Sequence, residues 1–520
     1  MQLNSYAKFL VSTFQKQHVE RKAESPSVSP IVTELASWYE RFRNSIEYRE
    51  EEMILRASIE RILKRKLALG GDKNSIGKQL VRELIWAQYI PEERGNERIV
   101  HEVTKTIDLH LKLKNGLADL KILKEGEVNS FIHNILSSDI ENIISPSEER
   151  ETIENYIFHV LRKNIKIEDG TEEDENAQLF IAIKKSYSKN DQALLDYHLF
   201  KQYFGPLTDE GFNKTLEHFA EGYKKIREHF NHPLRFKILN YVKKQIPPFL
   251  ILEDILRQNP QSIELIEGNE DLFNETVYET CRKRYGIIGT KVRRAIIRSV
   301  IFIALSKVFF AFAVEATYDN LFHGQIFWTP LAINILAPIS IMILISFLIR
   351  IPGDKNSAEI LRRIHILLTD PNPLLGRALS LNMSGKKERS SLYLLFTILW
   401  LIGFVLSFGA IVLLLMQFHF TLVNQGIFLF FLSIVSFLAY RINQTAQIYT
   451  VVERQNIFTP IIDLFFMPIA RVGRHLTEGI SQINIFLFIL DFIIETPYKG
   501  LVAFFEQWFF FLHSKRDDLA

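Results

Sequence analysis

The distribution of apolar residues divides the chain into two regions. Residues 1–290 mix polar and apolar positions at helical spacing, whereas four long apolar stretches follow between residues 297 and 440. A helix needs about 20 mostly apolar residues to cross about 30 Å of hydrocarbon. The sequence therefore predicts four membrane-spanning helices, at 297–318, 326–349, 392–416 and 422–440.

Positive charge is distributed unevenly around the four predicted spans. The segment 350–390 contains eight Lys or Arg residues, and Arg293, Arg294 and Arg298 lie at the start of the first span. The connections 315–325 and 417–426 contain no Lys or Arg. Because short cytoplasmic loops are enriched in these residues, the pattern predicts a multipass protein with both termini in the cytoplasm.

The region after the fourth span is predicted to form interfacial or re-entrant helices. The apolar segments 457–470 and 482–512 are interrupted by charged residues, among them Asp463 and Asp491, so each uninterrupted run has only about a dozen residues. A fifth and a sixth span are the alternative, since two added spans keep the carboxyl terminus inside.

The connection between spans two and three is predicted to contain a further helix. Residues 358–368 (AEILRRIHILL) place apolar side chains on one side at helical spacing. Two interpretations remain open. The helix lies on the membrane, where Arg362 and Arg363 meet anionic lipid, or it packs within a cytoplasmic domain.

The first 290 residues read as helices throughout, because alternating β-branched runs are few and capping signals are clear. Residues 145–148 (SPSE) resemble a capping box with proline at the first helical position, and predict a helix to about Leu161. The acidic run 168–175 predicts a solvated linker. The expected fold is all-α, with helical subdomains at 1–165 and 176–290, a transmembrane region at 291–440 and interfacial helices at 441–520.

Charge and cysteine content exclude several classes of function. Residues 1–290 contain 42 Lys+Arg and 46 Asp+Glu, whereas residues 291–520 contain 20 and 14. Neither region is basic enough for a nucleic-acid-binding domain, so we expect no nucleic-acid partner. The single cysteine, Cys281, excludes an internal disulfide and a cysteine-based zinc site. It is either an ordinary thiol or a site of lipidation.

Two segments match known catalytic or nucleotide-binding motifs only in part. LGGDKNSIGKQ resembles a phosphate-binding loop, but five residues separate Gly71 from Gly77, and Gln79 stands where Ser or Thr would bind a metal ion. His101 and Glu102 begin a metalloprotease pattern, but Lys105 occupies the position of the second histidine. In the first segment, the end of a helix and a turn explain Gly71 and Gly77 without a bound nucleotide.

His229 and His232 are three residues apart, so both could contact one metal ion from one face of a helix. Pro233 follows at once, and histidines that cap or flank a helix end are the commoner explanation. The chain has no nucleophile elbow, kinase motif set or Cys-x-x-Cys pair. We therefore expect no enzyme activity and no cofactor.

Lys307 is the one residue whose position, inside a predicted membrane span, is not explained by a purely structural role. It lies nine residues beyond Arg298, hence about 13 Å deeper along a helix and near the midplane of the first span. A charge there costs about 2.5–3.5 kcal/mol on insertion scales, so it should have a partner. Spans two to four contain no carboxylate. The candidate partners are Asn334, carbonyls freed by the prolines of the second span, Asp463 and Asp491.

Two stretches resemble a group of uncharacterised bacterial multipass membrane proteins. They are HPLRFKILNYVKKQIPPFLILEDILRQNP followed by RRAIIRSVIFIALSKVFFAFAVEATYD, and the tail DFIIETPYKGLVAFFEQW. The resemblance covers about the last 300 residues. It implies a bacterial inner membrane and brings no activity, cofactor or site.

Two functional hypotheses follow. The first is a non-enzymatic scaffold in the lipid bilayer, whose helical cytoplasmic head binds a protein partner, because the head is larger than the bundle and the outer loops are short. The alternative is a small transporter or channel, assembled as a homo-oligomer, that uses Lys307 and the proline-bearing second span. Transport requires a hydrated cavity that reaches Lys307, whereas a scaffold requires a binding patch on the head.

Overall fold

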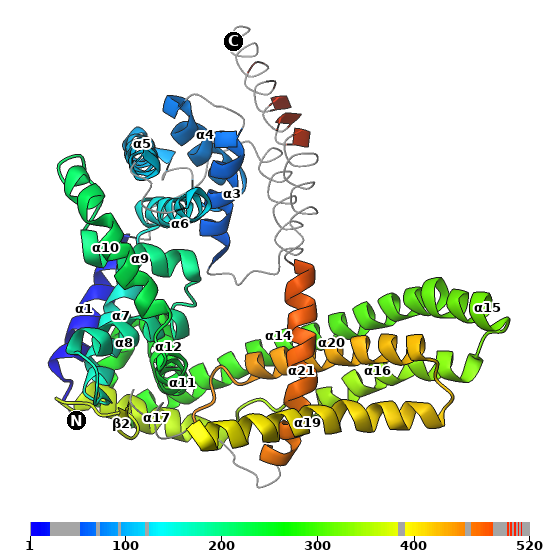
Figure 1. The fold of residues 1–520 in the computed structure, drawn as a ribbon. Coiled ribbons are helices and arrows are strands. Elements are labelled where there is room, and N and C mark those ends of the chain that lie inside the picture. Colours follow the sequence, from blue (N-terminus) through cyan, green and yellow to red (C-terminus); the bar gives the residue numbers. More distant parts are fainter. Residues whose placement is uncertain are drawn as a thin grey trace. The chain divides into compact units, whose positions relative to one another are not determined.

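The computed structural model describes residues 2–20, 53–68, 73–91, 95–119, 124–382, 390–452 and 459–481, and eight separate positions between 497 and 511. These residues are almost entirely helical, which confirms the predicted all-α fold. The chain forms two compact units (Figure 1). We call them the head unit (Asn4–Ile246, Pro371–Leu381 and Ile485–Ala520) and the apolar unit (Met1–Leu3, Pro247–Asp370 and Asn382–Asn484).

The described residues of the head unit form helices and one pair of short strands. The strands β1 (Ile165–Ile167) and β2 (Leu379–Leu381) pair in parallel, which brings a distant segment of the chain into this unit. The helices are α1 (Ser5–Glu20), α3 (Ile54–Ala68), α4 (Lys73–Trp86), α5 (Glu97–Asp119), α6 (Glu125–Ile144), α7 (Glu148–Arg162), α8 (Glu172–Ser186), α9 (Gln192–Phe204), α10 (Phe212–Phe230) and α11 (Arg235–Gln245).

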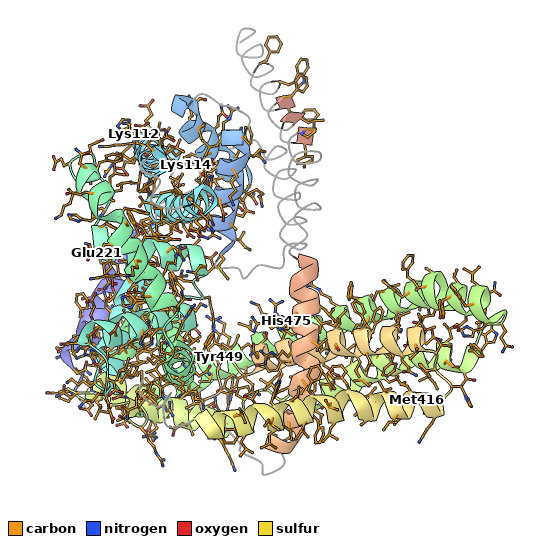
Figure 2. The ribbon with its side chains drawn as sticks, in the orientation of Figure 1. Lys112, Lys114, Glu221, Met416, Tyr449 and His475 are labelled. Atoms are coloured by element: carbon orange, nitrogen blue, oxygen red, sulfur yellow. The ribbon has the colours of Figure 1, made fainter. Side chains whose placement is uncertain are left out.

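One core of the head unit gathers around Phe131 of α6. Its ring packs edge-on against the rings of Phe200, Phe219 and Tyr223, with centroids 6.4, 5.8 and 5.1 Å away. Charged side chains such as those of Lys112 on α5 and Glu221 on α10 project from the surface (Figure 2). Because this core joins α5 and α6 to α8, α9 and α10, it unites residues from both sides of the predicted boundary at 165–176.

A second core joins α3, α4, α5 and α6. Gly77 of α4 lies against α5, and a Cβ added there would approach the Thr104 Oγ1 atom to 2.1 Å. A glycine at this position lets the two helices approach closely. Gly77 of the phosphate-loop-like segment therefore has a packing role.

The acidic run differs from its prediction as a linker. Four of its members, at 172–175, form the first turn of α8, and Thr171 caps this helix in a capping box with Asp174. Acidic side chains are favourable at a helix amino terminus, because the backbone N–H groups there carry partial positive charge. The acidic residues at 172–175 thus belong to the start of a helix and not to a linker.

The helix α7 begins later than the SPSE segment predicts. Its N-cap is Ser147, and its first residue is Glu148, two positions after the predicted proline start. The Ser147 side chain makes no capping hydrogen bond. Three glutamates in the first turn provide the favourable charge instead, and the helix ends at Arg162, one residue beyond the prediction.

The apolar unit contains four segments that are long and apolar enough to cross a membrane, among the residues that the structure describes. They are Glu270–His323, Trp328–Leu348, Leu394–Gln417 and Leu422–Ala446, and each overlaps one predicted span. The corresponding helices are α14 (Glu270–Phe310), continued by η4 (Ala311–Ala316) and α15 (Thr317–His323), then α16 (Trp328–Leu348), α19 (Ser390–Gln417) and α20 (Leu422–Ala446). This finding is consistent with a membrane protein.

The surface of these helices is apolar. Large hydrophobic side chains are exposed on all four segments, for example Phe309, Phe347, Leu401 and Leu422. Met416, near the end of α19, also projects outward (Figure 2). A water-soluble surface would not carry a patch of this extent, whereas a lipid-facing surface would.

The helix α21 (Thr459–Ser481) contains the first of the two predicted interfacial segments. It is not one of the four candidate spans, and it crosses α19 and α20 (Figure 1). At the crossing, a Cβ added to Gly473 would lie 1.9 Å from the Ser433 carbonyl oxygen. The glycine therefore allows α21 to lie directly on α20. Asp491 and most of the segment 482–512 lie outside the described residues.

The remaining helices of the apolar unit are α12 (Pro247–Gln258), η3 (Pro260–Ile263), α13 (Leu265–Gly268) and α17 (Asp354–Thr369). The helix α17 contains the predicted 358–368 segment. Its apolar face is fully buried at Ile360, Ile364, Leu367 and Leu368, and it packs against α12 and α14. Of the two interpretations of this helix, the burial favours the one in which it packs within the protein.

Candidate functional site: a buried ion cluster in the apolar unit

The site begins with a change of helix type. The long helix that starts at Glu270 turns from α-helical to π-helical over Ala311–Ala316 and then continues as α15. In a regular α-helix, Lys307 and Glu315 would lie about 80° apart around the axis. A π-helix has wider turns, closed by i→i+5 hydrogen bonds, and such segments occur frequently at functional sites. The wider turn brings Glu315 towards the face that carries Lys307.

Lys307 and Glu315 form an ion pair, with 2.8 Å between Nζ and Oε1. The Asn334 side chain of α16 donates its amide to the other carboxylate oxygen of Glu315 at 2.6 Å, and to the backbone carbonyl oxygen of Asn424 at 3.2 Å. The Asn424 side chain of α20 in turn donates to the two carboxylate oxygens of Asp319, at 3.4 and 3.3 Å. We call these five residues the ion cluster.

All five side chains of the ion cluster are completely buried, at 0% exposure. The Lys307 ammonium also lies 4.6 Å from the centre of the Phe431 ring, within the range of a cation–π interaction. Such a pair is stable only while its partners are present, because removal of one ion leaves the other uncompensated in an apolar interior. The cluster therefore ties α14 to α16 and α20.

Two of the residues predicted for an intramembrane polar site meet here, and two do not. Lys307 and Asn334 belong to the ion cluster. Asp463 lies on α21, half-buried, outside the cluster, and Asp491 is not among the described residues. The carboxylate partner of Lys307 is Glu315, in its own helix.

Glu315 and Asp319 were not among the predicted site residues, because the candidate carboxylates were restricted to spans two to four and the carboxyl-terminal segments. A signal was present, since Glu315 falls within the same apolar stretch as Lys307. The eight-residue spacing hides the relation on a regular helix, and only the π-helical turn makes the two side chains neighbours.

The predicted membrane-surface residues are placed as follows. Arg293, Arg294 and Arg298 are exposed on α14. Arg362 and Arg363 each pair with Glu359 of the same helix, at 2.7 and 2.8 Å, and the hydrogen bond from Arg362 lowers the pKa of Glu359 to about 2. Their contact with anionic lipid stays a prediction.

The two histidines with metal-ligand spacing, His229 and His232, make hydrogen bonds within the head unit. The His229 Nε2 atom lies 2.6 Å from the Tyr203 hydroxyl, and the His232 Nδ1 atom accepts from the Leu234 N–H at 3.3 Å. Burial lowers the pKa of His229 below its ordinary value. Within the described ranges, no group of three or more His, Cys, Asp or Glu residues could hold a metal ion.

The head unit has a cleft with a volume of about 380 Å³, formed by α7, α8 and α9. At its base, Lys184 and Glu154 form a buried ion pair with 2.8 Å between Nζ and Oε2. Phe158, His198 and Lys201 also line it. The cleft thus offers both signs of charge and aromatic surface to a ligand.

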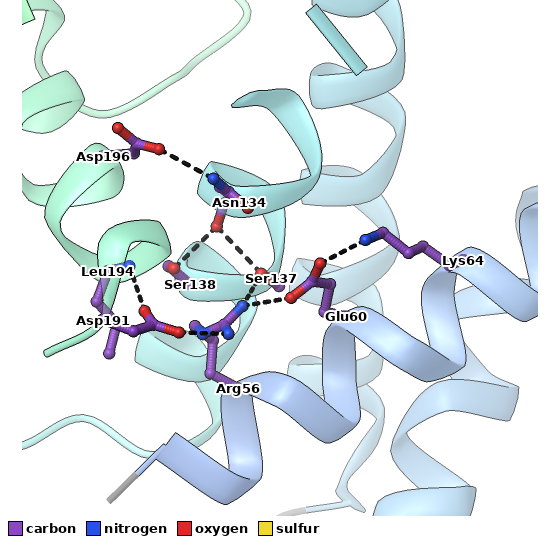
Figure 3. A network of polar contacts seen from close by, with 9 residues as sticks. All are labelled: Arg56, Glu60, Lys64, Asn134, Ser137, Ser138, Asp191, Leu194 and Asp196. Atoms are coloured by element: carbon purple, nitrogen blue, oxygen red, sulfur yellow. Dashed lines mark hydrogen bonds and ion pairs between the residues drawn. The ribbon is translucent and has the colours of Figure 1, made fainter. Parts of the chain in front are cut away.

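The head unit also has a buried cation, Arg56 of α3, which is 2% exposed (Figure 3). Its guanidinium donates to Glu60 at 2.7 Å and to Asp191 at 2.5 Å. Glu60 also pairs with Lys64 at 2.5 Å, and Lys64 is half exposed to solvent. Because Asp191 caps α9, this network fastens α3 to the start of α9.

Comparisons with known proteins add no family. No protein-family model, no curated protein and no solved structure matches the chain. The resemblance to bacterial multipass proteins stays a prediction, and so does the location in a bacterial inner membrane. The function has to be argued from the ion cluster and the cleft.

Proposed function

We propose that the protein is a membrane-anchored scaffold, in which the apolar unit holds the chain in the bilayer and the helical head unit binds another protein. One observation carries this proposal. The charged groups of the ion cluster are closed upon one another at zero exposure, so they are used to hold the anchor together.

The binding role falls to the head unit because its polar groups are accessible. Lys201 and Glu151 are exposed at the cleft, and Phe158 and Phe180 add apolar surface. Aromatic and charged side chains around a concavity are typical of a binding site for a peptide segment or a small polar ligand. The orientation with both termini in the cytoplasm would place this cleft on the inner side of the membrane.

The test uses a photo-crosslinking amino acid in the full-length protein in its native membrane. It is introduced at Lys201, beside the cleft, or at Glu221, an exposed control on α10. The scaffold proposal expects one discrete adduct from position 201 and none from 221. An adduct with the mass of two chains would identify a second copy as the partner. Equal diffuse labelling from both positions would contradict the proposal.

A small transporter is the second candidate, and one observation favours it. The polar contacts form a chain from Asp319 through Asn424, Asn334 and Glu315 to Lys307, along a helix with a π-helical segment. Buried ionisable residues with this connectivity are typical of proton relays. Pro338 of α16 also removes the N–H donor that would bond the Asn334 carbonyl in a regular helix.

Flux measurements separate the two candidates. The purified protein is reconstituted in liposomes with a pH-sensitive dye or a fluorescent monovalent-cation indicator inside. If the protein transports these ions, the flux should exceed that of empty liposomes, and Lys307→Met should abolish the excess flux. The scaffold proposal expects the same traces from protein-containing and empty liposomes.

A further inference from the structure

The ion cluster contains an unequal number of charges. It has one ammonium, on Lys307, and two carboxylates, on Glu315 and Asp319. With every group ionised it carries one net negative charge. An unpaired charge in a low-dielectric interior is unfavourable, and such a site usually changes its protonation state.

No second cation balances this charge among the described helices that surround the cluster. The helices α16 and α19 contain no Asp, Glu, Lys, Arg or His, and the one such residue of α20 is Arg441, exposed and seventeen positions beyond Asn424. His323 is exposed at the end of α15 and packs on the Tyr318 and Phe327 rings. The ionisable side chains of α21 are Asp463, Arg471, Arg474, His475 and Glu478, and Arg471 lies over the Trp400 ring of α19.

The amide oxygens of the cluster supply an independent observation. The Oδ1 atoms of Asn334 and Asn424 are buried and have no hydrogen-bond partner. Buried polar atoms in native proteins nearly always have one. The cluster therefore has too many acceptors and too few donors. One added hydrogen would neutralise its net charge and give one of the two amide oxygens a partner.

The geometry around Asp319 shows where that hydrogen would go. The Asn424 amide nitrogen lies 3.3 and 3.4 Å from the two carboxylate oxygens, which are long contacts for a charged acceptor. If the amide turns by 180° about its terminal bond, its oxygen faces Asp319 instead. A protonated Asp319 would then donate its O–H to the Asn424 Oδ1 atom, and this atom would have a partner.

Asp319 is also the carboxyl closest to the end of its helix. It precedes the capping Gly324 by five residues, or about 7 Å of helix, whereas Lys307 lies about 18 Å deeper than Asp319. A proton from the solvent beyond that helix end would reach Asp319 before the rest of the cluster.

We infer that the ion cluster is a proton-binding site, in which the Glu315–Asp319 pair takes up one exchangeable proton that Asp319 holds and donates to the Asn424 amide oxygen. The proton comes from water, one O–H bond forms on the carboxylate, and the net charge of the cluster becomes zero. This inference is independent of whether the protein is a scaffold or a transporter.

The test is infrared spectroscopy of the full-length protein in lipid nanodiscs, which resolves the C=O stretch of protonated carboxyl groups and its shift in D₂O. The Glu141→Gln background removes a head-unit carboxyl whose pKa burial raises to about 7, and whose band would overlap. At neutral pH we expect a band that Asp319→Asn abolishes. Glu315→Gln should abolish it too, because one ammonium and one carboxylate then balance.

Two further variants make the count of protons testable. Lys307→Met leaves two carboxylates without a cation, so the band should grow about twofold. Glu359→Gln, outside the cluster, should leave the band unchanged. A spectrum that Asp319→Asn and Glu315→Gln both leave unaltered would overturn the proposal. A band seen in choline chloride and lost in sodium chloride would overturn it too, because the site would then hold a sodium ion.

Discussion

Arg56 in the head unit and Lys307 in the apolar unit are both buried cations that contact carboxylates, and the two sites are balanced differently. Around Arg56 there are two carboxylates, Glu60 and Asp191, and a second cation, Lys64, that reaches solvent. The ion cluster of Lys307 also contains two carboxylates, of which Glu315 contacts the lysine, and no second cation belongs to the cluster.

The difference shows how the surroundings decide the charge of a buried network. In the head unit a flexible lysine on the surface neutralises the inner charges and keeps contact with water. In the apolar unit a lysine at the outer face of the helices would point into apolar surroundings, so the balance has to come from amides and, as we infer, from a proton. Removing the buried cation should therefore destabilise the apolar unit and the head unit by different amounts.

The largest effect is expected from Lys307→Met. Removing one partner of a buried ion pair costs about 3–5 kcal/mol, because the two buried carboxyl groups lose their compensating charge and must take up protons instead. The double variant Lys307→Met/Glu315→Gln should recover most of the loss. The measurement is thermal unfolding in nanodiscs, with hydrogen exchange of α14 and α16 as the local readout. Equal stability of the wild type and Lys307→Met would show that the buried ion pair does not stabilise the apolar unit.

Arg56→Met should destabilise the head unit by a smaller amount, about 2–4 kcal/mol. Glu60 and Asp191 are 17 and 24% exposed, so water can partly solvate the carboxylates that the variant leaves behind. Hydrogen exchange of α3 and α6 in the full-length protein measures the change. A loss as large as that of Lys307→Met would mean that solvent access does not distinguish the two sites.

The stability of the head unit should depend on pH through Glu141, a buried carboxyl group of α6. Burial raises the pKa of Glu141 from its ordinary 4.5 to about 7, so the folded state binds this proton more tightly than the unfolded chain. The resulting stabilisation is complete below pH 4.5 and is lost as the pH rises through 7. It amounts to about 3 kcal/mol.

The measurement for Glu141 is the free energy of local unfolding of α6 between pH 4.5 and 8, from hydrogen exchange corrected for its intrinsic pH dependence. Glu141→Gln is the matched control and should flatten the curve over this window. A wild-type curve that rises with pH across the same range would contradict the direction of the shift.

The smallest effect is expected from Lys64→Ala. An exposed ion pair contributes less than about 1 kcal/mol, and salt screens it. The loss measured by hydrogen exchange of α3 should shrink further at high ionic strength. A loss comparable to that of Arg56→Met would show that the exposed lysine, rather than the buried arginine, holds the network together.

The pattern of apolar residues was sufficient to predict the all-α fold and the positions of the four candidate spans, because both depend on composition over about 20 residues. The ends of single helices depend on local competition. For that reason α7 starts at Glu148 instead of Pro146, and the acidic run at 172–175 begins a helix instead of a linker.

The ion cluster was predictable only in part. A lysine inside an apolar stretch indicates a buried partner. Asn334, one of the candidate partners, lies in the same cluster, where its amide donates to Glu315. Glu315 could not be paired with Lys307 from α-helical periodicity, because the π-helical turn that joins them is a change in backbone hydrogen bonding with no clear signal in the sequence.

The most direct test of the account is an experimental structure of the protein in lipid, examined around Lys307. The account predicts a closed site, in which Lys307 contacts Glu315, Asn334 contacts Glu315 and Asn424, and no solvent path reaches the ammonium. A water-filled vestibule that ends at Lys307 would contradict it, and would make transport the leading function.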